Sequence, residues 1–469
     1  MKKLLLLTFL LIALFSVKEA DASHVMGSDI TYECLGNGLY KVTVTVYRDC
    51  NGIQLSSSPL TAKCASGSGS TSFNLTKIKV TDVTGIGSNC PTQSRCSGSY
   101  TYGIEEHVWE GVINLNSLNC CEVILGWEQC CRNGAITTGA SGANFYTSAK
   151  INKCVTPCNS SPKFTSSPAG IICVGQDFVF NNGASDTIDV GDSLSYKLIT
   201  PLSAEGTTIA YSGSWSAQKP ITFLGFPNAS LGFPAGFRLD SVTGDLSFRP
   251  TKQNEVTVMV IEVTEWRTIN GTPTVVGVTR RDMQIIVTPC PDNKVPKISG
   301  QSQTACSGQQ VCVTVTTDDA DADDTVRISW NRGIPRATFS NNNGATKRAG
   351  GSVCWTPAES DVSNIPYTFT ITAKDDACPR PGQAIRSFSI TVRESPKGTI
   401  QATKLTCGKV AIDYTPAKNN YPGLTHTWSV KDSTDATIAS STKKKDTIRM
   451  QPGRNRLFLT LRTSTPCVN

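Results

Sequence analysis

Apolar and polar residues alternate in many short segments of this chain. Residues 40–47 alternate strictly, are rich in β-branched side chains and run into Asn51-Gly52, as a strand does that ends in a tight turn. Similar runs recur to the end of the chain, at residues 193–199, 311–317 and 456–462 among others. No long stretch has the apolar period of an amphipathic helix. The pattern predicts an all-β protein.

The stretch 120–138, CCEVILGWEQCCRNGAITT, contains two vicinal cysteine pairs around one alternating run. Residues two apart in a strand share a face, so each face carries one cysteine of each pair. One face has Cys121, Val123, Leu125, Trp127 and Cys131, and the other has Cys120, Ile124 and Cys130. Because thiols on both faces can be bridged to neighbours on either side, we expect this strand to be the stapled centre of a β domain.

Connectors rich in Ser and Pro divide the chain into domains. We expect a leader at residues 1–22, a disulfide-rich N-terminal β domain at 23–158, and β-sandwiches at 159–290, 291–395 and 396–469. Short strands at regular spacing with turn residues between them are typical of sandwiches. Because the second and third domains share their layout, we expect tandem copies that form a rod and touch end to end.

The first 22 residues have the pattern of an export signal. Lys2 and Lys3 precede an apolar run at residues 4–15, and Ala20-Asp21-Ala22 resembles a cleavage site, so we expect the mature chain to start at Ser23. The apolar run is too short to span a bilayer, and no later segment approaches the required length. We therefore expect an extracellular or cell-surface protein, exported by the Sec route, without an integral membrane segment after leader cleavage.

All 19 cysteines follow the leader. In an exported chain this number argues for disulfides rather than for metal or redox chemistry. The main candidates bracket the first strong strand, flank the central strand, or lie at the two ends of the last domain: Cys34, Cys50, Cys120, Cys121, Cys130, Cys131, Cys407 and Cys467. Eleven cysteines precede residue 159, so one of them is expected to reach Cys173 or to stay free.

The charges are dispersed along the chain. The formal net charge is +7, and the one tight basic cluster, residues 443–445, is expected to be a solvated loop. A nucleic-acid-binding surface concentrates basic residues on one face and interleaves them with aromatic residues. That pattern is missing, so we expect no nucleic-acid partner.

Two domains carry clusters of acidic residues. Those of the third domain precede one strand and follow a later one: Asp318, Asp319, Asp321, Asp323, Asp324, Asp375 and Asp376. Carboxylates are hard oxygen ligands, and the two loops can meet at one pole of a sandwich, so these residues are candidate Ca²⁺ ligands. The alternative is a solvated turn that favours Asp. The second domain has a sparser set in Asp186, Asp189, Asp192, Glu262 and Glu265, which makes a weaker Ca²⁺ case.

Motifs for enzyme chemistry are missing. The three histidines, His24, His107 and His426, lie in different domains, and no HExxH, GxSxG or phosphate-binding glycine motif occurs. Glu105-Glu106-His107 is expected to be surface polarity rather than an acid–base site. The tryptophans are spread at one or two per domain, as core aromatics are, with Trp109 and Trp215 as candidates for sugar stacking. We expect no enzyme activity and no cofactor other than Ca²⁺.

Several segments together resemble a known protein family. Residues 23–27 (SHVMG), 30–52 (ITYECLGNGLYKVTVTVYRDCNG) and 130–138 (CCRNGAITT) resemble the N-terminal region of large Bacteroidota surface proteins of the gliding-motility-associated or adhesin-like type. The domains at 159–290 and 291–395 resemble dystroglycan-type cadherin-like repeats, and the domain at 396–469, which the chain end could truncate, loosely resembles an Ig-like or PKD-like repeat.

The resemblance implies a non-catalytic modular extracellular protein that acts in cell adhesion or gliding motility. Its partners would be surface glycans or other cell-surface proteins. The family implies export by the type IX system, which normally needs a C-terminal sorting domain. No such domain precedes Asn469, so we expect either a longer protein or another route. The alternative function is that of glycan-binding modules in a secreted polysaccharide-degrading protein.

Overall fold

The computed structural model describes residues 24–469, except residues 56–58, 167, 169, 187, 190, 191, 227–234, 406, 407, 419, 420, 422, 451–454, 463–466, 468 and 469. The leader expected at residues 1–22 lies outside the described residues. The described part consists of strands, with a single 3₁₀ turn at Glu359–Asp361, so the all-β prediction is confirmed. In that part of the chain, no helix has the length and apolar character needed to cross a membrane.

The N-terminal sandwich has two four-stranded layers. One layer has the order β1 (Val25–Gly36), β2 (Leu39–Asp49), β6 (Ile104–Asn114) and β5 (Thr76–Asp82), and the other has the order β8 (Phe145–Asn152), β7 (Glu122–Gln129), β3 (Leu60–Cys64) and β4 (Ser70–Phe73). The two layers enclose one core, to which the predicted alternation of β2 contributes Val42, Val44 and Val46. Trp109 of β6 and Trp127 of β7 lie in the same core.

One long strand, β19 (Thr272–Thr288), connects this sandwich to the next. One of its edges pairs first with β8 and then with β1, with Gly277 opposite Ile151 and Asp282 opposite Ser28. Its other edge pairs along its length with β18 (Val256–Ile269). One sheet of 14 strands therefore continues across the boundary that the sequence suggested at residue 158.

The second sandwich packs β18 and β19 against a small sheet. β13 (Ser193–Ile199) extends the first layer, and the second layer has the order β11 (Phe178–Asn181), β17 (Asp245–Phe248) and β16 (Phe237–Leu239). The remaining short strands are β9 (Lys163–Phe164), β10 (Ile171–Cys173), β12 (Ala184–Ser185), β14 (Leu202–Ala204) and β15 (Thr207–Thr208). Phe178, Phe180, Phe223 and Phe248 give this core an aromatic centre.

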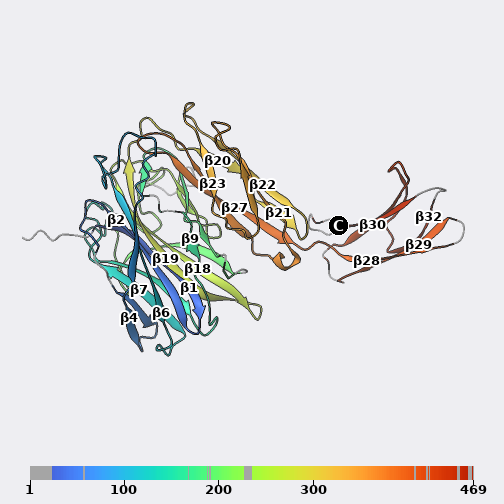
Figure 1. Ribbon diagram of the computed structural model, residues 1–469, viewed down its shortest axis with the longest axis horizontal. Coiled ribbons are helices and arrows are strands. Elements are labelled where there is room, and N and C mark those ends of the chain that lie inside the picture. The colour runs from blue at the N-terminus through green and yellow to red at the C-terminus, as the bar shows by residue number, and fades with distance from the viewer. Residues whose placement is uncertain are drawn as a thin grey trace, which may run out of the picture.

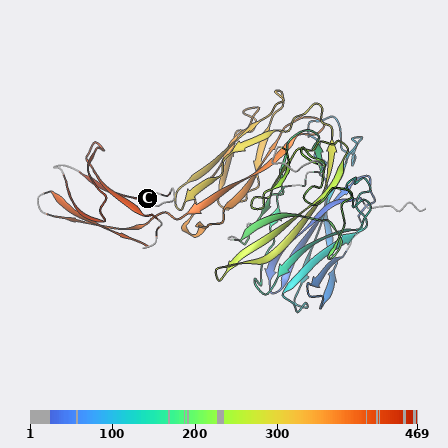
Figure 2. The same cartoon turned by 180° about the vertical axis from the view of Figure 1, so that it is seen from behind.

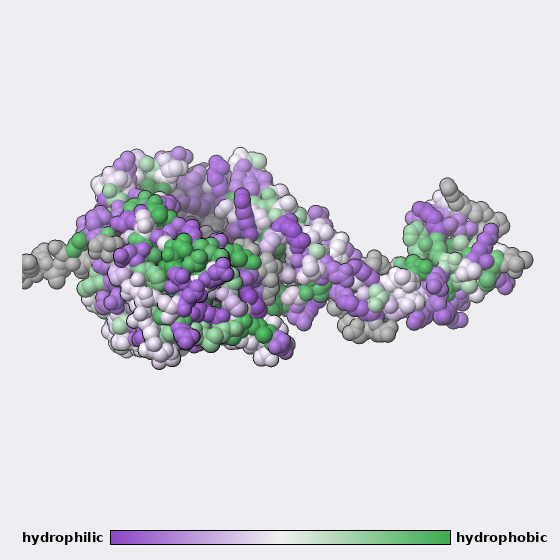
Figure 3. Space-filling view, turned by 60° about the horizontal axis from the view of Figure 1, so that its bottom comes forward, coloured by the Kyte–Doolittle hydropathy of each residue, from purple (hydrophilic) through white to green (hydrophobic). Residues whose placement is uncertain are grey.

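The third and fourth sandwiches are each made of two layers. The layers of the third are β20 (Lys297–Gly300), β22 (Val311–Asp318), β25 (Gly351–Trp355) and β24 (Thr338–Asn341), facing β21 (Gln303–Cys306), β27 (Gln383–Arg393), β26 (Tyr367–Lys374) and β23 (Arg327–Trp330). The layers of the fourth are β28 (Gly398–Lys404), β29 (Lys409–Pro416) and β32 (Lys445–Arg449), facing β31 (Thr437–Ser441), β30 (Thr425–Lys431) and β33 (Arg456–Arg462). Figure 3 shows the fourth sandwich as a separate lobe on a narrow waist.

The expected rod is wrong for the first three sandwiches, which lie side by side in both ribbon views (Figure 1, Figure 2). Ile385 of β27 is buried in the aromatic core of the second sandwich. The Ser387 amide and hydroxyl donate to Asp245 of β17 at 3.0 and 2.9 Å. A disulfide between Cys90 and Cys378 ties the first sandwich to the third. The fourth sandwich projects away from the other three (Figure 1, Figure 2). The rod was wrongly expected because the lateral contacts join residues far apart in sequence.

Eighteen of the 19 cysteines form nine disulfides, and Cys407 lies outside the described residues. The pairs are Cys34–Cys158, Cys50–Cys96, Cys64–Cys120, Cys90–Cys378, Cys121–Cys154, Cys130–Cys131, Cys173–Cys290, Cys306–Cys467 and Cys312–Cys354. Cys467 thus closes onto Cys306 of β21 and not onto Cys407. The expectation that one N-terminal cysteine reaches Cys173 or stays free is also wrong, because Cys90 reaches Cys378.

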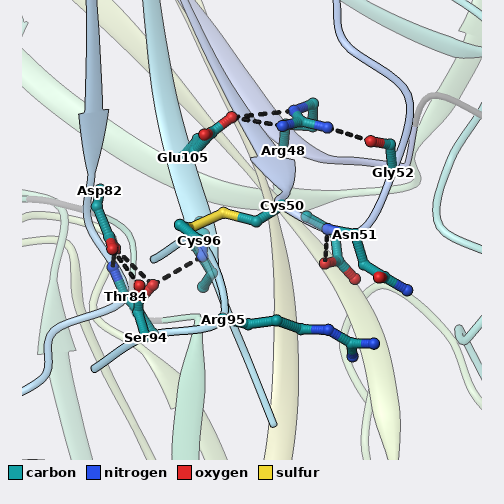
Figure 4. Close-up of a disulfide and its surroundings, with 12 residues drawn as sticks. Arg48, Cys50, Asn51, Gly52, Asp82, Thr84, Ser94, Arg95, Cys96 and Glu105 are labelled. Carbon is teal, nitrogen blue, oxygen red and sulfur yellow. Dashed lines mark hydrogen bonds and ion pairs between the residues drawn. A yellow bond between two sulfur atoms is a disulfide. The ribbon is translucent and has the colours of Figure 1, made fainter. Parts of the chain in front are cut away.

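The loop that carries Cys90 is anchored at its base (Figure 4). The Cys50–Cys96 disulfide ties the loop to the end of β2. Asp82, at the end of β5, accepts hydrogen bonds from the Thr84 amide and hydroxyl at 3.0 and 2.6 Å, and another from the Ser94 hydroxyl. These bonds hold both sides of the loop to the sheet, so Cys90 is presented from a fixed base.

The central strand β7 is stapled to its neighbours through the first of its two cysteine pairs, as predicted, whereas Cys130 and Cys131 bond to each other and not to neighbouring strands. Val123 and Leu125 are fully buried in the core. Cys120 bonds to Cys64 at the end of β3, and Cys121 bonds to Cys154 just after β8. The two neighbours that pair with β7 are therefore also joined to its start by disulfides.

The CCRNGAITT segment docks the first sandwich onto the β18–β19 hairpin. Arg132 is 1% exposed and donates to both carboxylate oxygens of Asp282 on β19, at 3.0 and 2.6 Å. Its guanidinium lies 4.4 Å from the ring centroid of Phe145. The Thr137 amide donates to the Val256 carbonyl at 2.8 Å. The motif that carries the family resemblance thus has a structural role at this seam.

We expect Asp282→Asn to lower the free energy of unfolding by about 3–5 kcal/mol, because it leaves the buried charge of Arg132 without its partner. Glu122→Gln is the matched control. Glu122 and Lys150 form a 2.9 Å ion pair in the same sheet with 43% and 33% of their side chains exposed, and its loss should cost about 0–1 kcal/mol. Urea unfolding of the oxidised protein measures both, and equal losses would contradict the assigned role of the buried pair.

Candidate metal centre

The junction between the second and third sandwiches gathers acidic side chains from two loops. Asp319, Asp321 and Asp324 follow β22 and place carboxylate oxygens within 4.8 Å of one another. Asp375 follows β26 and is 4% exposed. Asn293, in the connector before β20, donates its Nδ2 to Asp375 Oδ1 at 3.5 Å. The two acidic loops and the connector therefore meet at one pole of the third sandwich.

Four side-chain oxygens at this junction are buried without a hydrogen-bond donor: Asn293 Oδ1, Asp319 Oδ2, Asp324 Oδ2 and Asp375 Oδ2. The other oxygens of two of these carboxylates are held by the backbone. Asp319 Oδ1 accepts from the Asp321 amide at 3.0 Å, and Asp375 Oδ1 accepts from the Gly382 amide at 2.8 Å. Leaving a buried acceptor unpaired costs about 1–3 kcal/mol, and more for a charged group. The loops thus fix the carboxylates while one oxygen of each stays unpaired.

The negative charge of this cluster has little compensation. Burial raises the pKa of Asp375 to about 6, and the charge of Asp319 adds to the rise. Burial also raises the pKa of Asp319 and of Asp324, and the charge of Asp321 contributes to both. The nearby Arg348 donates to the backbone carbonyls of Asp319 and Asp321, at 3.0 and 2.6 Å. A donor set of carboxylate and amide oxygens suits Ca²⁺ and is unlike the N/S sets of softer metals.

Three of the seven candidate aspartates lie outside this group. Asp318, Asp323 and Asp376 are exposed. Asp323 is 3.4 Å from Lys347, and Asp376 accepts a hydrogen bond from the Thr325 amide at 2.7 Å. Asn293 is not among the candidate ligands that the sequence predicts. Its signal is the repeated Asn-x-x-Pro of the two connectors, at residues 159–162 and 293–296.

The junction before the second sandwich repeats this arrangement with a guanidinium inside it. Asp186, Asp189 and Glu265 place oxygens within 4.8 Å of one another. The Ser160 amide donates to Asp189 at 2.7 Å, as the Lys294 amide does to Asp321 at the other junction. Of the remaining acids of the second domain, Glu262 forms ion pairs with Lys197 and Arg280 at 2.7 and 2.8 Å, apart from this group.

Arg267 supplies the positive charge at this first junction. It donates to both oxygens of Asp192, at 2.7 and 2.6 Å, and to Asn159 Oδ1 at 2.8 Å. Burial, and next to it the charge of Asp186, raises the pKa of Glu265 well above its usual range. At the first junction an arginine thus binds the carboxylates directly, whereas at the second Arg348 binds backbone carbonyls of the acidic loop.

The other residues considered for chemistry are structural. His107 is fully buried, and its Nε2 lies 3.1 Å from Glu105 Oε2, within hydrogen-bonding distance. Its ring stacks on that of Trp109 with the centroids 5.6 Å apart. Glu105 is also bound by Arg48 at 2.5 and 3.2 Å (Figure 4). The Glu105-Glu106-His107 segment therefore belongs in part to a buried hydrogen-bonded network and is not simply a polar stretch exposed to solvent. Trp109 is 3% exposed, and Trp215 packs against the second core, so neither ring lies free on the surface.

Comparison with known proteins identifies no relative by sequence: no family model and no curated protein matches the chain. Among solved structures, the four N-terminal Ig domains of Dscam1 isoform 6.44 match at 11% identity and a TM-score of 0.23, over 94% of this chain and 96% of that one. The D1–D4 fragment of ICAM-5 matches at 8% identity and a TM-score of 0.21, over 92% and 93%. Titin domains A168–A170 match at 11% identity and a TM-score of 0.21, over 64% of this chain and 92% of that one. Likeness at these TM-scores assigns the chain to none of these proteins.

We expect Arg267→Met to lower the free energy of unfolding by about 2–3 kcal/mol, because Asp192 and Asn159 lose their donor while they stay buried. Arg249→Met is the matched control. Arg249 and Asp177 form a 2.6 Å pair with 34% and 29% of their side chains exposed, so its loss should cost about 1 kcal/mol or less. Thermal unfolding in EDTA compares the two variants. A smaller loss for Arg267→Met than for Arg249→Met would show that this junction does not need the guanidinium.

Proposed function

We propose that this protein is a non-catalytic, modular extracellular protein that acts at a cell surface in adhesion, and that it binds one Ca²⁺ at the junction of its second and third sandwiches. The observation that supports the ion is the set of four buried oxygens without donors at Asn293, Asp319, Asp324 and Asp375. A divalent cation would satisfy these oxygens and balance the charge. Asp321, with its oxygens in the same group, would complete the protein ligands.

The cation would act here as a structural brace. Asn293 belongs to the connector, and Gln176 of the second sandwich binds that connector from the other side, by donating to the Asn293 carbonyl at 2.6 Å and accepting from the Val295 amide at 2.7 Å. An ion held by Asn293 and the two loops would therefore fix the third sandwich to the connector. Nine disulfides are consistent with an oxidising, extracellular setting.

The finer assignments of the function depend on sequence resemblance. Gliding-motility association, a Bacteroidota source and type IX export follow from the segments at residues 23–27, 30–52 and 130–138. Surface proteins or glycans of other cells are the proposed partners. The alternative, a set of glycan-binding modules in a polysaccharide-degrading protein, loses its two named stacking candidates, because Trp109 lies in the core and Trp215 packs against one.

Calorimetry on the exported chain, stripped with EDTA, should show one Ca²⁺ bound per chain and a higher unfolding temperature with the ion present. Asp319→Asn and Asp375→Asn should abolish both effects, because each removes a buried ligand oxygen. Asp323→Asn should keep both effects, because the Asp323 side chain is fully exposed. No heat and no thermal shift for the wild type, or equal losses for Asp323→Asn and Asp319→Asn, would remove the site.

Adhesion can be measured with beads coated with the oxidised chain and applied to cells. We expect bead binding above that of beads coated with the reduced, unfolded chain. Protease treatment of the target cells should abolish binding to a protein partner, and periodate should abolish binding to a glycan. The adhesive role is contradicted if folded and unfolded coatings bind equally to all cells tested.

A further inference from the structure

Three of the nine disulfides follow one another along the chain without overlap. They are Cys34–Cys158, Cys173–Cys290 and Cys306–Cys467, and they span 124, 117 and 161 residues. In each, the two Cα atoms are only 5.3 or 5.4 Å apart. The chain therefore enters and leaves each closed loop at the same point. Only residues 159–172 and 291–305 lie between consecutive loops.

The strand pairing agrees with this arrangement. Among the paired strands of the described residues, two pairs are parallel, β10 with β19 and β21 with β27. The entering strand β10 ends at Cys173 and the leaving strand β19 ends just before Cys290, at the same pole of the second sandwich. Likewise, Cys306 ends β21 opposite Arg393 of β27, and Ser395 binds Ser307. Each of these sandwiches thus lies to the side of a covalent path.

The fourth sandwich also lies outside that path. The chain leaves the third sandwich at Ser395, builds β28 to β33, and returns to the buried Cys467 beside Cys306. A pull on Cys467 is therefore transmitted to Cys306 through one S–S bond, without crossing any strand of the fourth sandwich.

We infer that the protein is a covalent tension tether, in which a pulling force between the two ends passes through Cys34–Cys158, Cys173–Cys290 and Cys306–Cys467 in series and bypasses the sheets that these bonds enclose. The inference extends the proposed surface role, because a surface protein that holds a partner is pulled, but it requires neither Ca²⁺ nor a particular ligand. Only the two connectors, about 30 residues, can lengthen, which limits the extension between Cys34 and Cys467 to about 100 Å.

Cys90–Cys378 is a second connection in parallel with this path. It bonds the loop after β5 in the first sandwich to the loop after β26 in the third. While it is intact and the two sandwiches that it joins stay folded, the force between the ends also crosses these sandwiches, and the two connectors are not stretched. The Gly87 amide, which donates to the Pro379 carbonyl at 3.1 Å, adds a hydrogen bond beside this disulfide. The series path carries the full tension only after Cys90–Cys378 opens.

Single-molecule stretching of the oxidised chain, with a handle at each end, tests the tether. The wild type should show no unfolding step of several hundred ångströms. The C90S/C378S variant should lengthen by about 100 Å, through the two connectors. Adding C173S/C290S should open the second loop, which encloses no other cysteine, and give a further step of about 400 Å. The matched control is C312S/C354S, whose disulfide lies inside the third loop, and it should behave as the wild type does.

A second measurement uses the wild type alone, so it still tests the tether if a variant fails to fold. The wild type is held at constant force and a reductant is added, and extension beyond about 100 Å should begin only after the reductant arrives. A step of several hundred ångströms in the oxidised wild type, or in C312S/C354S, would overturn the tether. Loss of Ca²⁺ binding or of adhesion leaves these outcomes unchanged, so failure of the proposed function and failure of the tether are distinguishable.

Discussion

Buried charges on β19 set the arrangement of the first three sandwiches. Asp282 pairs with Arg132, and Arg281 lies 3.3 Å from Asp29 of β1. Charges of this kind are tolerated in a sheet only where both partners are in place, so they fix which strand can pair with both β8 and β1. Once β19 is there, the first and second sandwiches share a sheet, and the third is held against the second through Asp245 and Ile385.

Local patterns predicted the strands with a clear period of two, such as β2, β7 and β13, and the stapling of β7 by its flanking cysteines. The full length of β19 is not evident from the sequence, because Arg280, Arg281 and Asp282 interrupt its apolar pattern. Arg281 and Asp282 are buried against Asp29 and Arg132, which lie more than a hundred residues away and in no local window. Side-by-side packing and the Cys90–Cys378 bond escaped prediction for the same reason.

The candidate metal centre could be predicted in part from the sequence, because its aspartates are clustered there. Which of them turn inward depends on backbone donors such as the Gly382 amide, and the role of Asn293 emerges only when the two connectors are compared. The comparison also shows two solutions to one electrostatic problem. At one junction Arg267 binds the carboxylates directly, and at the other Arg348 binds the backbone carbonyls of the acidic loop and leaves the carboxylate oxygens unpaired. The two junctions can therefore respond differently to the ionic surroundings.

The Cys90–Cys378 bond has a consequence for biogenesis. Twelve cysteines lie between these two residues in sequence, so in a chain that enters an oxidising compartment N-terminus first all of them arrive before Cys378. Thiols pair with whatever partner is near, so early mispairing of Cys90 has to be reversed by thiol–disulfide exchange. Correct assembly thus depends on a disulfide isomerase activity in the cell that makes the protein. A host that pairs cysteines in order of appearance would also mispair the first sandwich, because Cys34–Cys158, Cys50–Cys96 and Cys64–Cys120 each enclose other cysteines.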